Sequence, residues 1–256
     1  MIRKLTEFHP ESLLGRLVRL PLRLIPPTRV VSVVGGINKG AAWICGSSIH
    51  GCWLGTYEPE MQRLMEKIVR PGMRIWDIGA NAGFYTLAFS RLVGGAGRVY
   101  AFEPLAGNAK NLLAHVRLNE LRNVTVVQTA LSAATGLAGF HVAPSNSMGH
   151  VAAAENSYLV PTVTVDGFLA ERPEARPDLI KVDVEGAESS LLAGGLQFLT
   201  HAAPEIVLAV HGPEQGRICA DLLASLGYSL FHPDGAPVAG GLTGSEQIHA
   251  RKIFNS

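Results

Sequence analysis

The stretch from Arg74 to Thr86, RIWDIGANAGFYT, limits the fold of this chain more than any other. Its first five residues are mainly apolar, as in a buried strand, and a helical pattern starts at Phe84. Gly79, Asn81 and Gly83 suit a tight turn because glycine and asparagine tolerate a positive φ angle. This order predicts a loop that presents backbone N–H groups to a ligand at a helix N-terminus.

A second strand-like run, RVYAFEP, ends in Glu103, 24 residues after Gly79. A carboxylate at that position can accept hydrogen bonds from both hydroxyl groups of a ribose. The spacing alone fits an NAD-type oxidoreductase or an S-adenosylmethionine (SAM) methyltransferase. The loop reads G-x-N-x-G, however, so the dinucleotide fingerprint is incomplete. Asp77 would repel a pyrophosphate but can face the amino group of a methionine, which favours SAM.

Apolar strands alternate with helical segments from residue 74 onward, which predicts a mostly parallel α/β sheet covered by helices on both faces. The interval 135–165 breaks this rhythm with an extra strand and a loop of small and polar residues. The predicted strands are 74–79, 98–103, 124–131, 179–185, 205–211, 228–232 and 247–254. The predicted helices are 84–93, 105–119, 187–199 and 214–226.

Polar residues stand at the carboxyl ends of several of these strands, where α/β sheets bind their ligands. Asp77, Glu103, Asp183 and His211 each follow apolar residues in this way. The third strand ends at residues 129–131, and we expect Ala130 and its neighbours to flank an adenine. Together these strand ends predict a polar crevice at one edge of the sheet.

Residues 1–56 are predicted to form an N-terminal extension, followed by a catalytic domain over residues 57–256. The first 30 residues interleave leucines with arginines, and Pro21, Pro26 and Pro27 interrupt any helix. We favour packing of this segment on the catalytic domain or on a second subunit, as in a homodimer. Peripheral contact of residues 1–25 with a membrane is the alternative. Trp43 and Tyr57 can equally cover the cofactor or belong to the core.

The composition restricts the functional class further. A formal net charge of +1 argues against a general nucleic-acid binder. Three cysteines at irregular spacing give no disulfide framework, which suggests a cytoplasmic protein. Cys45, His50 and Cys52 match no zinc-binding pattern. We find no apolar run of about 18 residues that would span a membrane.

Five segments, DIGANAGFYT, VYAFEP, VTVDGFL, DLIKVDVEGAE and IVLAVHG, together resemble the FkbM-type family of SAM-dependent methyltransferases. The resemblance covers about residues 53–230. It implies a class I, Rossmann-like methyltransferase fold with seven strands and methylation of an oxygen on a small molecule or glycan. It also implies which residues form the site. These are Asp77, Gly79, Asn81, Gly83 and Glu103 for the cofactor, and Asp183, Glu185 and Gly186 on the acceptor side. With Thr86 in the first turn of the helix and Ala130 at the end of the third strand, the list of expected cofactor-binding residues is complete.

The sequence DVEG in the fourth strand lacks the proline and aromatic ring with which many nitrogen methyltransferases grip a planar amine, so an alcohol acceptor fits better. A base must then remove the hydroxyl proton. His211 is the first candidate because imidazole titrates near neutrality, followed by Asp183 and then His50. Asp183 can instead be structural, paired with Lys181, and Glu188 is expected to be a solvated helix residue.

Two alternatives to a metal-free methyltransferase are a metal-assisted reaction and a non-catalytic protein with the same fold. Asp183, Glu185 and His211 can in principle hold a divalent ion, although we expect no metal. A non-catalytic interaction module with this fold is also an alternative. The complete motif set, with both Asp77 and Glu103 present, argues against it.

Overall fold

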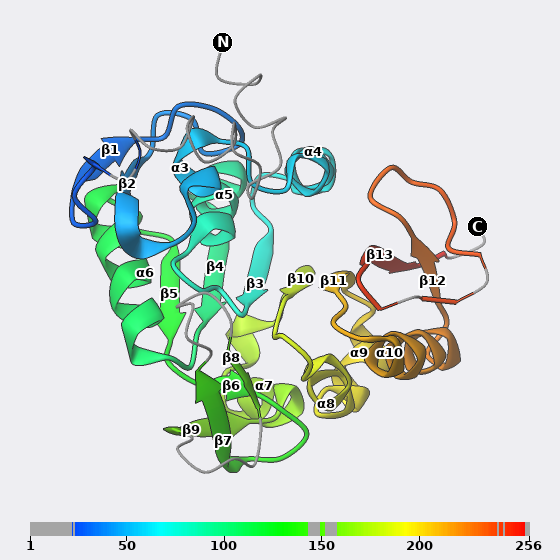
Figure 1. Ribbon diagram of the computed structural model, residues 1–256. Coiled ribbons are helices and arrows are strands. Elements are labelled where there is room, and N and C mark those ends of the chain that lie inside the picture. Colours follow the sequence, from blue (N-terminus) through cyan, green and yellow to red (C-terminus); the bar gives the residue numbers. More distant parts are fainter. Residues whose placement is uncertain are drawn as a thin grey trace.

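The main sheet of the protein has the strand order β12–β13–β11–β10–β3–β4–β5 (Figure 1). The computed structural model describes residues 22, 24–142, 149–151, 158–239, 241–242 and 244–253. In this part of the chain the sheet has seven strands, and only β13 runs antiparallel to its neighbours. The strands are β3 (Arg74–Ile78), β4 (Arg98–Phe102), β5 (Val124–Val127), β10 (Leu179–Val182), β11 (Glu205–Ala209), β12 (Tyr228–Phe231) and β13 (Gln247–Lys252). The predicted class I methyltransferase architecture is confirmed.

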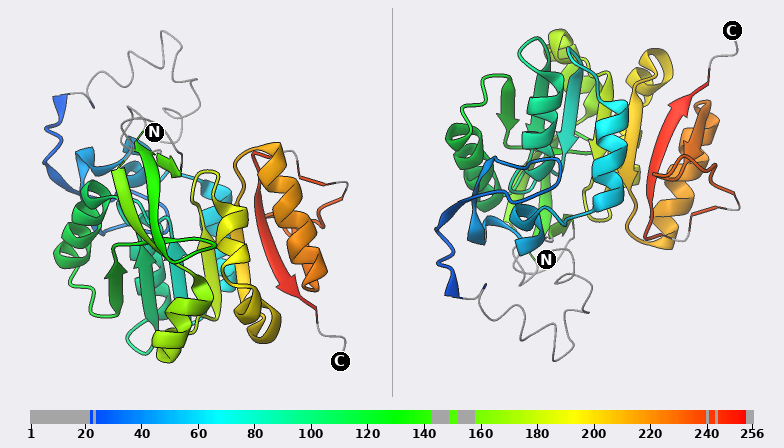
Figure 2. Two further views of the ribbon diagram at one scale, coloured as in Figure 1. Left: turned by 90° about the horizontal axis from the view of Figure 1, so that it is seen from below. Right: turned by 90° about the horizontal axis from the view of Figure 1, so that it is seen from above.

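Apolar side chains that alternate along the central strands build a core on each face of this sheet. Ile75 of β3 and Leu179 of β10 belong to one core, whereas Trp76 and Ile180 belong to the other. Helices α4 (Pro59–Ile68) and α5 (Phe84–Val93) cover the first face. Four helices cover the second face: α7 (Val165–Glu171), α8 (Glu188–Ala193), α9 (Leu196–Ala202) and α10 (Pro213–Ser225). Figure 2 shows the two helical layers from opposite directions.

The segment before α4 packs into the first of these cores. It contains β1 (Val30–Ser32), β2 (Ala42–Ile44), the 3-10 turn η2 (Cys45–Ser47) and α3 (His50–Leu54). Trp43 is fully buried and stacks on His115 of α6 (Ala106–Leu118), with ring centroids 4.0 Å apart. Residues on both sides of position 56 therefore share one core. The division into an extension and a catalytic domain stays a prediction, and most of residues 1–25 lie outside the described residues.

A smaller sheet follows β5 and occupies the interval in which the sequence rhythm breaks. Its order is β6–β9–β7–β8 in the part of the chain that the structure describes. The strands are β6 (Ala130–Leu131), β7 (Gly136–Val142), β8 (Gly149–Val151) and β9 (Tyr158–Val163). The predicted third strand thus divides into β5 and β6, and the predicted loop contains β8. Residues 143–148 and 152–157 lie outside the described residues.

The helix predicted at 187–199 is interrupted, because α8 ends before Gly194 and α9 begins after Gly195. A Cβ atom on Gly194 would lie 2.1 Å from the carbonyl oxygen of Ser132, so the chain needs glycine at this close approach. The other predicted elements of the sheet agree with the structure to within a few residues at their ends. Within the described residues, each helix is too short or too polar to cross a membrane.

Candidate active site

The loop between β3 and α5 has the positive φ angles that its sequence predicts. They are +74° at Gly79, +50° at Asn81 and +95° at Gly83. A Cβ atom on Gly79 would lie 1.8 Å from the backbone oxygen of Asp183, directly after β10. The chain order of the strands reverses between β3 and β10, which is where open α/β sheets bind ligands. The glycine loop therefore lies against the strand that carries Asp183.

Glu103 directly follows β4 and is almost fully buried beside this loop. One carboxylate oxygen accepts a hydrogen bond from the backbone N–H of Asn81 at 2.8 Å. The other accepts from the N–H of Leu105 at 2.9 Å and lies 3.4 Å from the amide nitrogen of Asn108. Burial raises the pKa of Glu103, and these donors oppose that rise. The oxygen that accepts from Asn81 has a second lone pair, so the group can still bind a hydroxyl of a ribose.

A cavity of about 260 Å³ joins Glu103 to the end of β10. Its walls combine loop backbone, apolar side chains and a small number of charged groups, as is usual for cofactor sites. Among the residues lining it are Tyr57, Gly79, Ala80, Asn81, Ala82, Tyr85, Glu103, Leu105, Asn108, Thr129, Ala130, Leu131, Lys181, Asp183, Val184 and Glu185. The cavity thus brings the predicted adenine, ribose and acceptor regions together.

Asp77 lies beneath the cavity and is fully buried. It accepts a hydrogen bond from the Thr86 hydroxyl at 2.5 Å, and its other oxygen lies 3.6 Å from Nζ of Lys181. Burial alone would lower the pKa of Lys181, but the charges of Asp183, Asp77 and Glu58 outweigh it and raise that pKa. These contacts support the floor of the site. The cavity-lining residues include neither Asp77, Thr86 nor Gly83.

On the acceptor side of the cavity, the imidazole of His211 lies close to three carboxylates, those of Asp183, Glu185 and Glu188. The imidazole Nε2 of His211 lies 3.7 Å from Oδ1 of Asp183 and 3.4 Å from Oε2 of Glu185. Its Nδ1 lies 2.7 Å from Oε1 of Glu188, whose side chain is fully buried. This hydrogen bond raises the pKa of His211 against the effect of burial, and the charges of Glu185 and Asp183 add to the rise. The expectation that Glu188 is a solvated helix residue is wrong.

His50, the third candidate base, lies apart from this group on α3. Its Nδ1 accepts a hydrogen bond from the indole nitrogen of Trp53 at 3.1 Å. Residues near it in the sequence, including Ile49 and Cys52, line the cavity, whereas His50 is absent from the lining. Burial raises the pKa of the Cys52 thiol to about 12, so the group remains protonated and is a poor nucleophile.

The sequence does not predict several residues of the site, or does not decide whether they belong to the site or to the core. Tyr57 and Tyr85 both line the cavity, and the Tyr85 hydroxyl donates to the carboxylate of Glu58 at 2.6 Å. The aromatic residues before α4 indicate that aromatic side chains form a wall of the site. They do not indicate which of these side chains face the cavity. Asn108 reaches Glu103 from the first turns of α6, and no pattern in the sequence marks it.

A model of the methyltransferase FkbM domain family matches residues 77–230 of the chain. The hexuronic acid methyltransferase AglP of Haloferax volcanii is 27% identical over 140 residues. The match covers 54% of this chain and 56% of AglP, so the chain spans about half the length of this curated relative.

Two solved structures are similar to the chain. The precorrin-6y C5,15-methyltransferase from Geobacter metallireducens GS-15 has a TM-score of 0.50 and 17% identity, covering 77% of this chain and 88% of that one. The methyltransferase FkbM from Methylobacillus flagellatus KT has a TM-score of 0.47 and 17% identity, covering 78% and 53%.

Proposed function

Because the chain belongs to the FkbM methyltransferase domain family, we propose that it transfers a methyl group from SAM to a hydroxyl oxygen of a glycan or small molecule. One observation carries this proposal. Glu103, which suits a ribose, and Asp183 and Glu185, which suit a polar acceptor, line the same cavity on either side of the glycine loop.

The residues of the cavity fit the parts of SAM in order. Glu103 would accept hydrogen bonds from the ribose, and residues 129–131 would contact the adenine. The backbone of residues 79–82 and the N-terminus of α5 would face the methionine part, where N–H groups suit a carboxylate. Asp77 would act from below, by holding Thr86 and Lys181, since it is fully buried.

Methyl transfer requires a hydroxyl oxygen in line with the carbon–sulfur bond. The oxygen forms a bond to the methyl carbon, the carbon–sulfur bond breaks, and the hydroxyl proton leaves. We assign the acceptor side to Asp183, Glu185 and His211, which face one another at the carboxyl ends of β10 and β11. Such a group both orients the hydroxyl and helps to remove its proton, an effect that is typically worth about 10²–10⁴-fold in rate.

The name of AglP suggests a first acceptor to test. AglP is described as a hexuronic acid methyltransferase, and we propose a sugar that bears a carboxylate as the acceptor class of this chain as well. An incubation with SAM carrying a labelled methyl group and glucuronic- or galacturonic-acid glycans should yield a labelled ether. Label in a nitrogen- or carbon-linked product would contradict the assignment to oxygen.

Calorimetric titration with SAM and with NAD tests which of the two cofactors the protein binds. Wild-type protein should bind SAM and not NAD. Glu103→Gln should weaken SAM binding by about 10–100-fold, because a hydrogen bond to a charged group contributes roughly 1.5–3 kcal/mol. Glu174→Gln, at an exposed glutamate of the turn Pro173–Ala175, is the matched control and should bind SAM like the wild type. Binding of NAD alone would instead favour an oxidoreductase.

A further inference from the structure

Three potential metal ligands meet at the edge of the cavity. One donor atom each from Asp183, Glu185 and His211 lies within 4.8 Å of the other two. The Nε2 atom of His211 is 3.4 Å from Glu185 and 3.7 Å from Asp183, which is longer than an ordinary N–H···O hydrogen bond. Ligand atoms about 2.1 Å from a shared ion lie roughly 3.0–3.5 Å from one another. The separation between His211 and Glu185 falls in this range and that between His211 and Asp183 lies just above it, so the three side chains can close around a cation after small movements.

Glu188 fixes the imidazole so that Nε2 faces this space. Its Oε1 accepts hydrogen bonds from Nδ1 of His211 at 2.7 Å and from the backbone N–H of Gly186 at 2.9 Å. A carboxylate that binds the far nitrogen of a histidine is the usual support of a metal-binding imidazole, because it sets the tautomer and the ring orientation. The fully buried Glu188 is thus placed to support a ligand.

The charges around this space also favour a cation. Asp183, Glu185 and Glu188 all approach His211, and in the part of the chain that the structure describes the ammonium group that pairs with these carboxylates is that of Lys181, 3.3 Å from Asp183. Lys181 is shared with Asp77 on the other side. Among the described residues, the second oxygen of Glu188 is buried without a hydrogen-bond partner. Carboxylates therefore outnumber the fixed positive charges in this group.

We propose that Asp183, Glu185 and His211 bind one divalent cation, best matched by Mn²⁺, and that the acceptor hydroxyl completes its coordination. Imidazole suits transition metals more than it suits Mg²⁺ or Ca²⁺, and among the transition metals Mn²⁺ is the one that carboxylates suit. The cation would lower the pKa of the bound hydroxyl and orient its oxygen. His211 would then be a ligand and not the base, and the hydroxyl proton would pass to solvent water. A carboxylate on the acceptor sugar could supply a further oxygen ligand. This inference rests on the proposed function.

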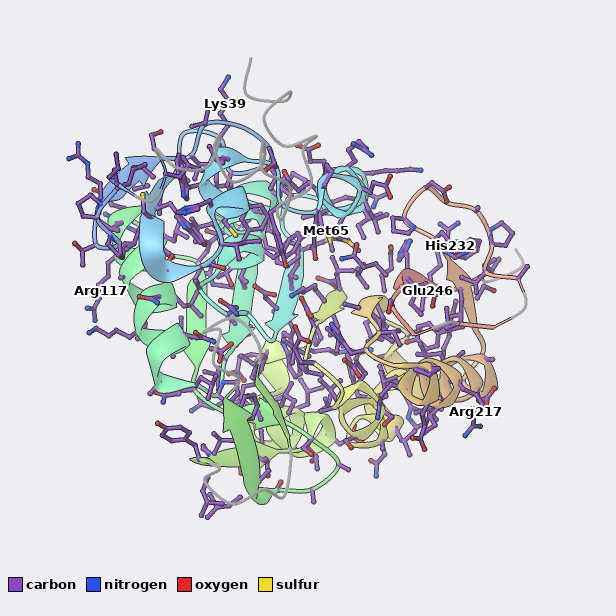
Figure 3. The ribbon with its side chains drawn as sticks, viewed as in Figure 1. Lys39, Met65, Arg117, Arg217, His232 and Glu246 are labelled. Atoms are coloured by element: carbon purple, nitrogen blue, oxygen red, sulfur yellow. The ribbon has the colours of Figure 1, made fainter. Side chains whose placement is uncertain are left out.

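Binding of Mn²⁺ to the EDTA-treated full chain tests the site directly, by calorimetry or by electron paramagnetic resonance. The wild type should bind one Mn²⁺. Glu185→Gln and His211→Ala should weaken binding by at least about 100-fold, and Glu188→Gln by about 10–100-fold. The control is Asp221→Asn on α10, where the exposed Asp221 pairs with Arg217 at 3.3 Å. Figure 3 shows Arg217 on the outer side of that helix, and this variant should bind Mn²⁺ normally.

Assays of methyl transfer and of SAM binding distinguish a failure of the cation site from a failure of the proposed function. EDTA should abolish methyl transfer and Mn²⁺ should restore it, while Glu185→Gln should still bind SAM within about twofold of the wild type. Full methyl transfer in EDTA, or equal Mn²⁺ affinity in wild type and Glu185→Gln, would overturn the cation site and leave the proposed function intact. Failure of the wild type to bind SAM would overturn the proposed function itself.

Discussion

The ammonium nitrogen of Lys181 lies 3.3 Å from the carboxylate of Asp183, two residues further along the chain. The register of β10 with β3 sets Lys181 opposite Asp77, whose carboxylate lies 3.6 Å away. The same ammonium group lies 5.2 Å from the centre of the Tyr85 ring. Lys181 therefore links the buried floor of the glycine loop to the acceptor side of the cavity.

Replacement of Lys181 tests this link. Lys181→Met removes the positive charge between two carboxylates and leaves the buried Asp77 without an ionic partner. Loss of one member of a buried ion pair costs about 3–5 kcal/mol, so the free energy of unfolding should fall by about that amount. Urea denaturation measures it. Lys39→Met, at the exposed lysine labelled in Figure 3, is the control and should change stability little.

The double variant Asp77→Asn/Lys181→Met sharpens the test, because it removes both charges of the buried pair. It should regain part of the stability that Lys181→Met loses. A double variant as unstable as the sum of the two single variants would mean that the two groups do not interact across the strands.

Gly79 and Gly94 offer a second pair of matched variants. Both have positive φ angles, +74° and +67°, and ψ at Gly94 is −171°, so an alanine at either position carries backbone strain of about 1–3 kcal/mol. Only at Gly79 would the new Cβ atom also meet the backbone of Asp183, whereas at Gly94 no atom lies within 4 Å of it. Gly79→Ala should therefore lose both stability and SAM binding, whereas Gly94→Ala should lose stability through backbone strain alone and bind SAM like the wild type.

Thermal unfolding and SAM calorimetry on the two glycine variants check this difference. Equal melting temperatures and equal SAM affinities would show that the glycine loop does not approach β10 as closely as the structure indicates.

The pH dependence of stability should reveal a hydrogen bond between the side chains of β11 and β13. Oε2 of Glu205 lies 2.7 Å from Nε2 of His249, and this contact lowers the pKa of Glu205. A carboxyl group whose pKa is lower in the folded state stabilises the fold above its unfolded pKa, about 4.3, and this stabilisation disappears as the pH falls through the folded pKa. Glu205→Gln should therefore lower the melting temperature at neutral pH more than at about pH 3.5.

Calorimetric melting of wild type and Glu205→Gln over this pH range measures the difference. Glu174→Gln again serves as the control for loss of one exposed carboxylate. A gap between wild type and Glu205→Gln that stays constant down to the lowest pH would exclude the ionised carboxylate as its cause.

The sequence was informative where one strand determines the position of a residue. Period-two alternation along β10 put Lys181 and Asp183 on one face, and the structure shows their contact. The order of strand, loop and helix likewise placed the glycine loop and Glu103 beside one cavity. These contacts depend on the local geometry of one strand or one loop, and the pattern of apolar and polar residues predicts that geometry.

Relations between distant elements could not be predicted in the same way. Glu188 occupies a helix position that looks solvated, and its burial depends on how α8 packs under His211 at the end of β11. The division of one predicted helix at Gly194 depends on its close approach to Ser132, which lies 62 positions earlier in the chain. In each case the deciding contact joins segments whose relative position no local pattern specifies.

His115 connects the segment before α4 to the glycine loop. Its Nε2 accepts a hydrogen bond from the N–H of Ile44 at 3.0 Å, so its Nδ1 carries the proton that it donates to the carbonyl oxygen of Ala82 at 2.7 Å. The ring also stacks on Trp43. His115→Phe keeps an aromatic ring but leaves both backbone groups without this partner, at a cost of about 1–3 kcal/mol for each buried group.

Because Ala82 lies in the loop that lines the cavity, His115→Phe should weaken SAM binding as well as the fold. His201→Phe is the control, since the exposed His201 bonds only to the carbonyl oxygen of Gln197 within its own helix in the described structure. Chemical denaturation gives the stability and calorimetry gives the SAM affinity. If His115→Phe unfolds more easily yet binds SAM like the wild type, His115 supports the core without positioning the loop.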